Sequence, residues 1–299
     1  MFKNSAMTQS MIKTIAGKAI GDLKSGGMRG TRNMLELCCK FATTPFYQEF
    51  WGFLKELLTV PDNHYSDLMQ RISRTVHEET LKTLTVNLGY NAFSYGREQL
   101  LARYAQLGAA DLWLQRMDVS QSLPDADVFS QWNDKGVFVF LMEEIQSEED
   151  VLQILKMAAK NQYSIFALKL THGVLGEVID SQAMTQEQEN VCFLMEDAIV
   201  PEIAAAMQKR KLFFGFSRNY CEVESIEEER ALMQEYIANG YIMGVYQDKE
   251  VPTEYAETLY REMTRSRFTG ASEIFLCDLE RDAVAMQRVL LGMNQWKRQ

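Results

Sequence analysis

The sequence predicts an α/β protein: a partial (β/α) barrel of about six parallel strands, preceded by an N-terminal helical region. Two observations lead to this prediction. From residue 110 onward, short apolar runs rich in branched and aromatic residues alternate with amphipathic helical patterns, which is typical of parallel βα units. Before residue 99, the apolar residues recur mainly at helical spacing.

Six apolar runs are expected to form the strands, because each is short and followed by a helical pattern. An eight-stranded barrel needs more strands than these, so the sequence favours an open barrel. The runs are Ala110–Asp118, Gly136–Met142, Tyr163–Leu170, Lys211–Ser217, Tyr241–Tyr246 and Glu273–Asp278.

The helices between these strands are marked by their first residues. Ser147 precedes three acidic residues, and Ser225 precedes a glutamate at the third position, so both serines are expected to cap helices. A single long helix is predicted between Thr185 and Lys209, with a kink or break at Pro201.

The N-terminal part divides into two segments ahead of the barrel, which is expected to span residues 99–299. Residues 1–32 contain a basic amphipathic helix over residues 9–24, which Gly26 and Gly27 are expected to end. Such a helix can lie on an anionic membrane surface, although it more often packs on its own domain. Residues 33–98 are expected to form helices and a connector in which Gly89 and Gly96 adopt conformations that other residues avoid. The four expected helices are Met34–Phe41, Pro45–Leu58, Asp62–Val76 and Glu78–Val86.

Composition narrows the class of protein. The 299 residues are 46% apolar and 24% charged, which is typical of a globular chain. The net charge of −10 disfavours nucleic acid as a partner. No apolar run reaches the roughly 18 residues of a membrane span, and charged residues interrupt any signal-peptide core. Five cysteines without paired spacing indicate no disulfide framework and fit a reducing cytoplasm.

Several segments of the chain resemble bacterial radical SAM proteins, which are AdoMet-dependent iron–sulfur enzymes. The run Val86–Gly96 resembles the connector before their barrel, and Ala110–Asp118 and Phe138–Glu144 resemble their first two barrel strands. Phe213–Tyr220 is similar to a later strand, and Val251–Glu257 to the start of a late helix. The resemblance covers roughly residues 45–290 and implies the same half-barrel architecture.

Two departures from that family concern its chemistry. The resemblance implies three cysteines, spaced C-x3-C-x2-C, after the first strand, where they hold a [4Fe–4S] cluster that binds AdoMet. This chain has Val119–Asp127 there, with no cysteine. A Gly-Gly-Glu-Pro motif that receives the AdoMet amino group is replaced by Met142–Ile145. We therefore expect no cofactor, neither a [4Fe–4S] cluster nor AdoMet, and no cluster assembled from Cys192, Cys221 and Cys277.

Other chemistry could use the ends of the strands. Lys169 could form a Schiff base, with His172 moving protons, although an ion-paired or solvated lysine is the commoner interpretation. Glu143 and Glu144 could join Asp118 and Asp278 at a metal, although adjacent carboxylates are usually solvated. A ligand pocket at the strand ends is expected to involve Asp118, Arg218, Asp248 and Asp278.

Three hypotheses for function remain open. The first is a cytoplasmic, non-catalytic, radical-SAM-like protein that binds a protein or peptide partner and contains no bound metal. The second is an enzyme that uses Lys169 and His172. The third is a regulator that binds AdoMet or another nucleoside without a cluster.

Overall fold

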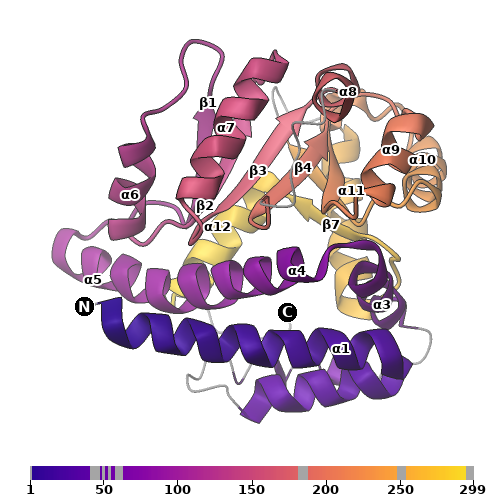
Figure 1. Ribbon diagram of the computed structural model, residues 1–299. Helices are drawn as coiled ribbons and strands as arrows, with labels where there is room; N and C mark the ends of the chain where they lie inside the picture. The colour runs from indigo at the N-terminus through magenta and orange to yellow at the C-terminus, as the bar shows by residue number, and fades with distance from the viewer. Residues whose placement is uncertain are drawn as a thin grey trace.

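A computed structural model describes residues 2–40, 48, 51–52, 55–57, 63–180, 188–247 and 254–293. Its centre is a seven-stranded, all-parallel sheet in which every strand lies beside its neighbours in the chain. The sheet curls into a half barrel (Figure 1). The strands are β1 (Leu114–Asp118), β2 (Val139–Glu143), β3 (Ile165–Leu170), β4 (Val191–Met195), β5 (Phe214–Asn219), β6 (Met243–Gln247) and β7 (Phe275–Asp278).

The seventh strand is β4, where the sequence predicted part of a long helix. All five of its residues are buried, and it pairs with β3 and β5. The predicted helix from Thr185 to Lys209 is therefore wrong. Pro201 does not kink a helix but begins one, because the first position of a helix needs no backbone N–H donor. The expected cap at Thr185 lies outside the described residues.

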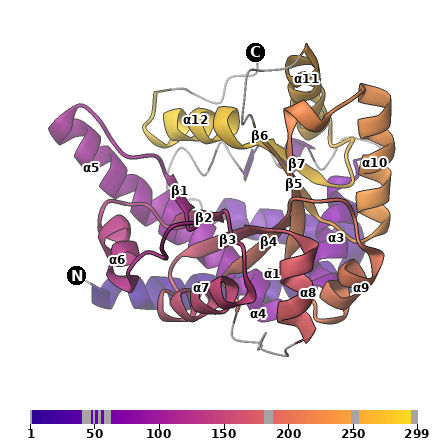
Figure 2. The ribbon, with the colours of Figure 1, turned by 90° about the horizontal axis from the view of Figure 1, so that it is seen from above.

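Helices cover the convex face of the sheet, as Figure 2 shows from above. The main hydrophobic core lies between them and the outward side chains of the strands. Two of these helices begin at the expected caps: Ser147 Oγ accepts from the backbone of Asp150, and Ser225 Oγ from that of Glu228, both at 3.2 Å. The helices are α6 (Ala126–Asp134), α7 (Glu148–Lys160), α8 (His172–Asp180), α9 (Pro201–Lys209), α10 (Ile226–Ala238) and α11 (Glu254–Thr269).

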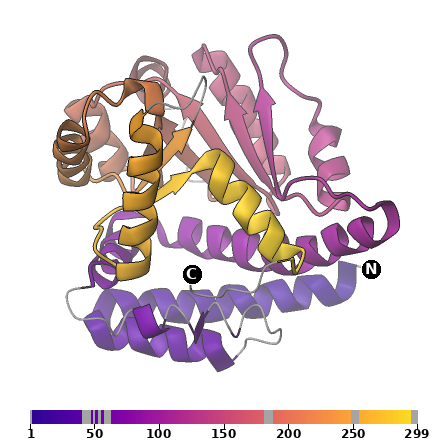
Figure 3. The same cartoon turned by 180° about the vertical axis from the view of Figure 1, so that it is seen from behind.

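The last helix, α12 (Leu279–Leu290), crosses the concave side from β7 to the start of β1 (Figure 3). The backbone N–H of Trp113 donates to Gln287 at 2.9 Å, and the Trp113 indole donates to the carbonyl of Ala283 at 3.1 Å. Gln287 in turn donates to the carbonyl of Asp111 at 2.9 Å. These contacts join the two edges of the half barrel.

The N-terminal helices form a layer under the amino ends of the strands (Figure 1). Helices α4, η1 and α5 follow one another without interruption from Glu78 to Leu107, so the expected boundary at residue 98 lies within this rod. The layer contains α1 (Phe2–Lys40), α3 (Tyr65–Thr75), α4 (Glu78–Thr85), η1 (Val86–Gly96) and α5 (Arg97–Leu107).

Helix α1 differs from the prediction, since it does not end at Gly26 and Gly27 but continues to Lys40. Leu35 nevertheless packs with Ala19 and Leu23, so the later part of α1 folds back on the earlier part. The apolar face of residues 9–24 packs on α3 and α4, and Lys13 and Lys24 form ion pairs with glutamates of α4. In this structure the face that could meet a membrane lies against the protein itself.

The connector also differs from the prediction, because it is a π-helix, η1. Gly96 has an ordinary right-handed conformation, with φ of −60°. Glycine is needed at this position because the backbone packs closely against it. A Cβ there would lie 2.4 Å from the carbonyl oxygen of Gly136 and 2.8 Å from that of Asn91. Gly89, in contrast, has open space where a Cβ would lie.

Candidate functional site

A row of charged side chains lies at the carboxyl ends of β1 to β4, and we call Arg116, Glu143, Lys169 and Glu196 the strand-end network. Arg116 donates two hydrogen bonds to the Glu143 carboxylate, at 2.7 and 2.9 Å. The Lys169 ammonium lies 3.6 Å from Glu143 and 2.9 Å from Glu196. The charges therefore alternate in sign along four neighbouring strands.

Strand alternation and register bring this network together. Side chains two residues apart on a strand point to the same face, so Arg116 shares its face with Asp118. Parallel pairing sets Asp118 beside Glu143, which places Arg116 and Glu143 on one face of the sheet. Lys169 is only 1% exposed and Glu143 only 8%. Ion pairing compensates for the cost of burying a charge, which would be several kcal/mol for an unpaired ion. The Lys169 Nζ makes no well-directed hydrogen bond, so its partners hold it by charge alone.

Sequence reasoning identified Lys169 and Glu143 but missed Arg116 and Glu196. Arg116 lies inside the predicted strand Ala110–Asp118, and a cation within a strand was the available signal. Glu196 follows β4 directly, and it was missed because β4 itself was assigned to a helix. Arg116 also reaches Glu280 of α12 at 2.8 Å, so α12 is tied to the network.

His172 belongs to a different group of contacts from Lys169, although the two residues are only three positions apart in the sequence. The His172 ring contacts Asp197 at 2.5 Å through Nδ1 and the hydroxyl of Tyr241 at 2.8 Å through Nε2. Burial raises the pKa of Tyr241, so its hydroxyl stays protonated and can donate. Among the described residues, no hydrogen bond or ion pair joins His172 to Lys169.

The other predicted site residues also have separate surroundings. Asp118 is exposed and accepts a hydrogen bond from the backbone of Ser120 at 2.9 Å, which helps to lower the pKa of its carboxyl. Glu144 is exposed and has a left-handed φ of 59°. Asp248 lies outside the described residues.

Arg218 and Asp278 face the helices rather than the strand-end network. Arg218 lies 3.3 Å from the buried carboxylate of Glu229. Asp278 is 1% exposed, accepts from the Tyr220 hydroxyl at 2.7 Å, and caps α12 through the backbone of Arg281. Both side chains therefore have clear structural partners.

A pair of amides continues the polar edge at β5 and β6. Gln247 donates to Asn219 at 3.1 Å and is 1% exposed. Its side-chain oxygen is buried without a hydrogen-bond partner. Sequence reasoning did not select either amide, since neither residue type signals a particular chemistry.

The cysteines can be tested as ligands of an iron–sulfur cluster. Cys192 and Cys277 lie in an apolar cluster on the concave side, and burial raises the pKa of each thiol to about 12. Cys221 is exposed and lies beyond β5, in η2 (Tyr220–Glu222). The structure therefore places Cys192 and Cys277 in one apolar cluster and Cys221 in a different element.

No protein-family model matches the chain, and no curated protein matches it significantly. The resemblance to radical SAM proteins consequently rests on the segments named above.

Two features are absent from the described parts of the chain. Within them, no group of three or more His, Cys, Asp or Glu side chains is arranged to hold a metal ion. No helix among those same residues has the length and apolar character needed to cross a membrane.

Proposed function

We propose that this protein is a non-catalytic, radical-SAM-like binding protein whose half barrel recognises a protein or peptide partner. The observation that carries the proposal is the strand-end network, because charges that an enzyme would direct at a substrate are paired with one another. The second support is the cysteine-free segment after β1, which contains Ser120 where the family's cluster ligands are expected.

The network also weighs against Schiff-base chemistry at Lys169. A lysine attacks a carbonyl group as the neutral amine, so it must first lose its proton. Glu143 and Glu196 lie 3.6 and 2.9 Å from the Lys169 Nζ, so a carbonyl substrate would have to displace these partners. His172, the expected proton carrier, is engaged by Asp197 and Tyr241.

Exposed apolar side chains support a protein or peptide as the partner. Tyr104, Leu107 and Leu112 are 36%, 60% and 43% exposed, and all three lie in the segment from α5 to β1. Exposed apolar groups that gather on a surface are typical of protein contacts. In a pull-down, the wild-type protein should retain a specific partner that the Leu107→Glu variant does not retain. Equal retention of the partner by both proteins would show that this segment is not the binding surface.

Anaerobic iron–sulfur reconstitution tests the absence of radical chemistry. The wild-type protein should retain no more iron than a Cys192→Ala/Cys277→Ala variant. It should also lack the absorbance of an iron–sulfur cluster at about 400 nm. About four iron atoms per chain, together with AdoMet binding, would overturn the proposal.

Two further measurements distinguish the alternatives. With borohydride and a panel of carbonyl compounds, the wild type and the Lys169→Met variant should form the same trapped adducts. An adduct that depends on Lys169 would favour the enzyme hypothesis. AdoMet should leave the unfolding temperature unchanged, whereas a true ligand at 100 times its Kd adds about 2.7 kcal/mol of stability.

A further inference from the structure

The first 40 residues differ in charge from the rest of the chain. They contain seven lysine and arginine residues and only two acidic residues, so their net charge is +5. Since the whole chain carries −10, the remaining residues carry −15. All seven cations belong to α1, which lies at the outer side of the helical layer, away from the sheet (Figure 1). Positive charge is therefore concentrated at one side of the molecule, whereas the body is acidic.

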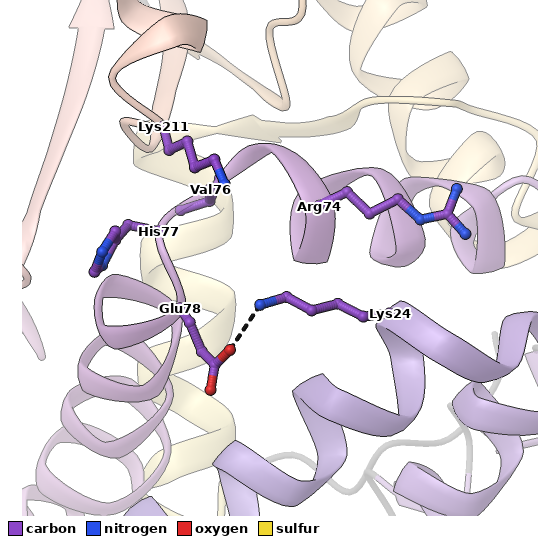
Figure 4. Close-up of a pocket in the computed structure, with 6 residues that line it drawn as sticks. All are labelled: Lys24, Arg74, Val76, His77, Glu78 and Lys211. Atoms are coloured by element: carbon purple, nitrogen blue, oxygen red, sulfur yellow. Dashed lines mark hydrogen bonds and ion pairs between the residues drawn. The ribbon is translucent and has the colours of Figure 1, made fainter.

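Two of these cations are paired with the protein itself. Lys13 lies 3.1 Å from Glu79, and Lys24 lies 2.7 Å from Glu78, so both pairs help to position α1 on α4. Figure 4 shows the Lys24–Glu78 pair beside a cavity of about 410 Å³, which is formed where α1, the α3–α4 junction and Lys211 meet. The other basic side chains in this view point in different directions, so the cavity does not gather them around a single anion.

The side of α1 that faces away from the protein forms a continuous exposed stripe. Its members are spaced by three or four residues, which places them on one side of a helix. Ala16, Ala19, Ile20 and Leu23, on the opposite side, are each 6% exposed. We call the exposed side the outer stripe, and its residues are Met7, Met11, Thr14, Lys18, Gly21 and Ser25.

Exposed cations lie on the outer stripe and on the later part of α1, which folds back. Lys18 belongs to the stripe, and Arg29 and Arg32 are exposed in the later part. Within the described parts of the chain, the ion pairs of α1 involve only Lys13 and Lys24. The three exposed cations therefore have no carboxylate within ion-pair distance there.

Two apolar side chains accompany these cations. Met7 and Met11 are one turn apart on the outer stripe, and they are 76% and 51% exposed. A methionine side chain is unbranched and flexible, so it can adapt to an irregular apolar surface. The outer side of α1 thus combines positive charge with apolar groups.

We propose that the outer side of α1 binds the surface of an anionic lipid bilayer. A bilayer presents many anionic headgroups side by side, so separate cations can each find a partner without converging on one anion. The two methionines can enter the boundary between the headgroups and the acyl chains. This binding is independent of the partner proposed for the half barrel.

The proposal uses a different face of α1 from the one that the sequence suggested. The apolar face of residues 9–24 is the usual membrane-binding side of such a helix, but it is buried on α3 and α4. The outer stripe can meet a bilayer while α1 stays in place. Because α1 and the strand-end network lie at opposite ends of the strands, the network then faces away from the bilayer (Figure 1).

A lipid surface suits these residues better than a nucleic acid, the other common polyanion. Residues 3–40 contain no aromatic side chain on which a base could stack. Exposed methionines gain little from phosphates but can be buried in a bilayer. The acidic body would also repel a nucleic acid that extends beyond α1.

The test is sedimentation of the full chain with vesicles of phosphatidylcholine, with and without phosphatidylserine. The protein should sediment with vesicles that contain phosphatidylserine and stay in solution with pure phosphatidylcholine. Binding should weaken as sodium chloride is added, because salt screens the headgroup charges. Lys18→Gln/Arg29→Gln/Arg32→Gln, the α1 variant, should bind roughly a hundredfold more weakly, at about fivefold for each cation.

Two further variants separate position, charge and apolar contact. Lys156→Gln/Arg230→Gln/Arg261→Gln, the control variant, removes three positive charges from exposed positions on α7, α10 and α11. It has the same net charge as the α1 variant but should bind as the wild type does, because its substitutions lie away from α1. Met7→Gln/Met11→Gln keeps every charge and should weaken the binding that remains at high salt. All the substituted side chains are exposed, so the unfolding temperatures should stay close to that of the wild type.

Equal sedimentation of the wild type with both kinds of vesicle, or equal binding by the α1 variant and the control variant, would overturn the proposal. Binding to single-stranded RNA without binding to vesicles, measured by filter binding, would assign α1 to a nucleic acid instead. Self-association that the α1 variant loses, again without vesicle binding, would assign α1 to the acidic body of a second copy. None of these outcomes bears on the partner of the half barrel, whose pull-down depends on Leu107.

Discussion

The close contact between Gly96 and Gly136 provides a sharp test of the fold. In Gly96→Ala the new methyl group would lie 2.4 Å from the carbonyl oxygen of Gly136 and 2.8 Å from that of Asn91. Both atoms belong to backbone, so they cannot rotate away as a side chain could. Gly89, in the same helix η1, has open space at this point and is the matched control.

The expected magnitudes follow from packing and helix preference. Overpacking costs about 1–3 kcal/mol, and two rigid backbone contacts favour the upper end. The gain of about 1 kcal/mol for alanine over glycine in a helix offsets part of this cost. Gly96→Ala should therefore lose about 2 kcal/mol of stability, whereas Gly89→Ala should gain about 0.5–1 kcal/mol.

The assay is thermal and urea unfolding of both variants beside the wild type. At roughly 2 °C per kcal/mol for a chain of this size, the unfolding temperature should fall by about 4 °C for Gly96→Ala and rise slightly for Gly89→Ala. A similar loss for both variants would mean that both glycines are needed for backbone conformation, which would refute the packing argument. An unchanged Gly96→Ala would refute the contact itself.

Two other predictions concern titratable groups. Because its partners, with Lys24 first, hold the pKa of Glu78 at about 2 instead of 4.5, protonation favours the unfolded chain. The stability that this carboxylate contributes should be complete above about pH 4.5 and lost as the pH falls toward 2. The urea midpoint of Glu78→Gln should therefore decline less than that of the wild type over this interval. Parallel pH profiles of the two proteins would exclude this role for Glu78. Cys192 is buried, and burial raises the pKa of its thiol to about 12, so it should react with a thiol reagent only in denaturant, as peptide mass spectrometry can check; rapid labelling of Cys192 in the native protein would contradict its burial.

The fold class and six of the seven strands were predictable because apolar runs and helix caps repeat regularly from residue 110. Strand β4 was not, since five apolar residues in a row fit a buried strand or a buried helix equally well. Pro201 was read as a kink within the predicted helix, although it suits the first position of a separate one. The sequence supports both interpretations, and only the neighbouring strands decide between them.

The candidate site was predictable in part for a related reason. That Lys169 and Glu143 lie at strand ends follows from the chain itself, but the side chains that meet there depend on register between strands. Lys169 and His172 are close in sequence yet have different partners, because the chain leaves β3 and enters α8 between them. The cavity beside Lys211 depends on three separate segments, and sequence patterns could not predict that they meet.

The strand order has a consequence for how the protein is made. Each strand pairs with the one synthesised just before it, so the sheet can grow from β1 as the chain leaves the ribosome. The residues of α12 that bond to Trp113 are about 170 positions downstream and emerge after all the strands of the sheet. The edge of β1 therefore stays uncovered until α12 has been synthesised, and a ribosome stalled before α12 would expose a strand edge that favours aggregation.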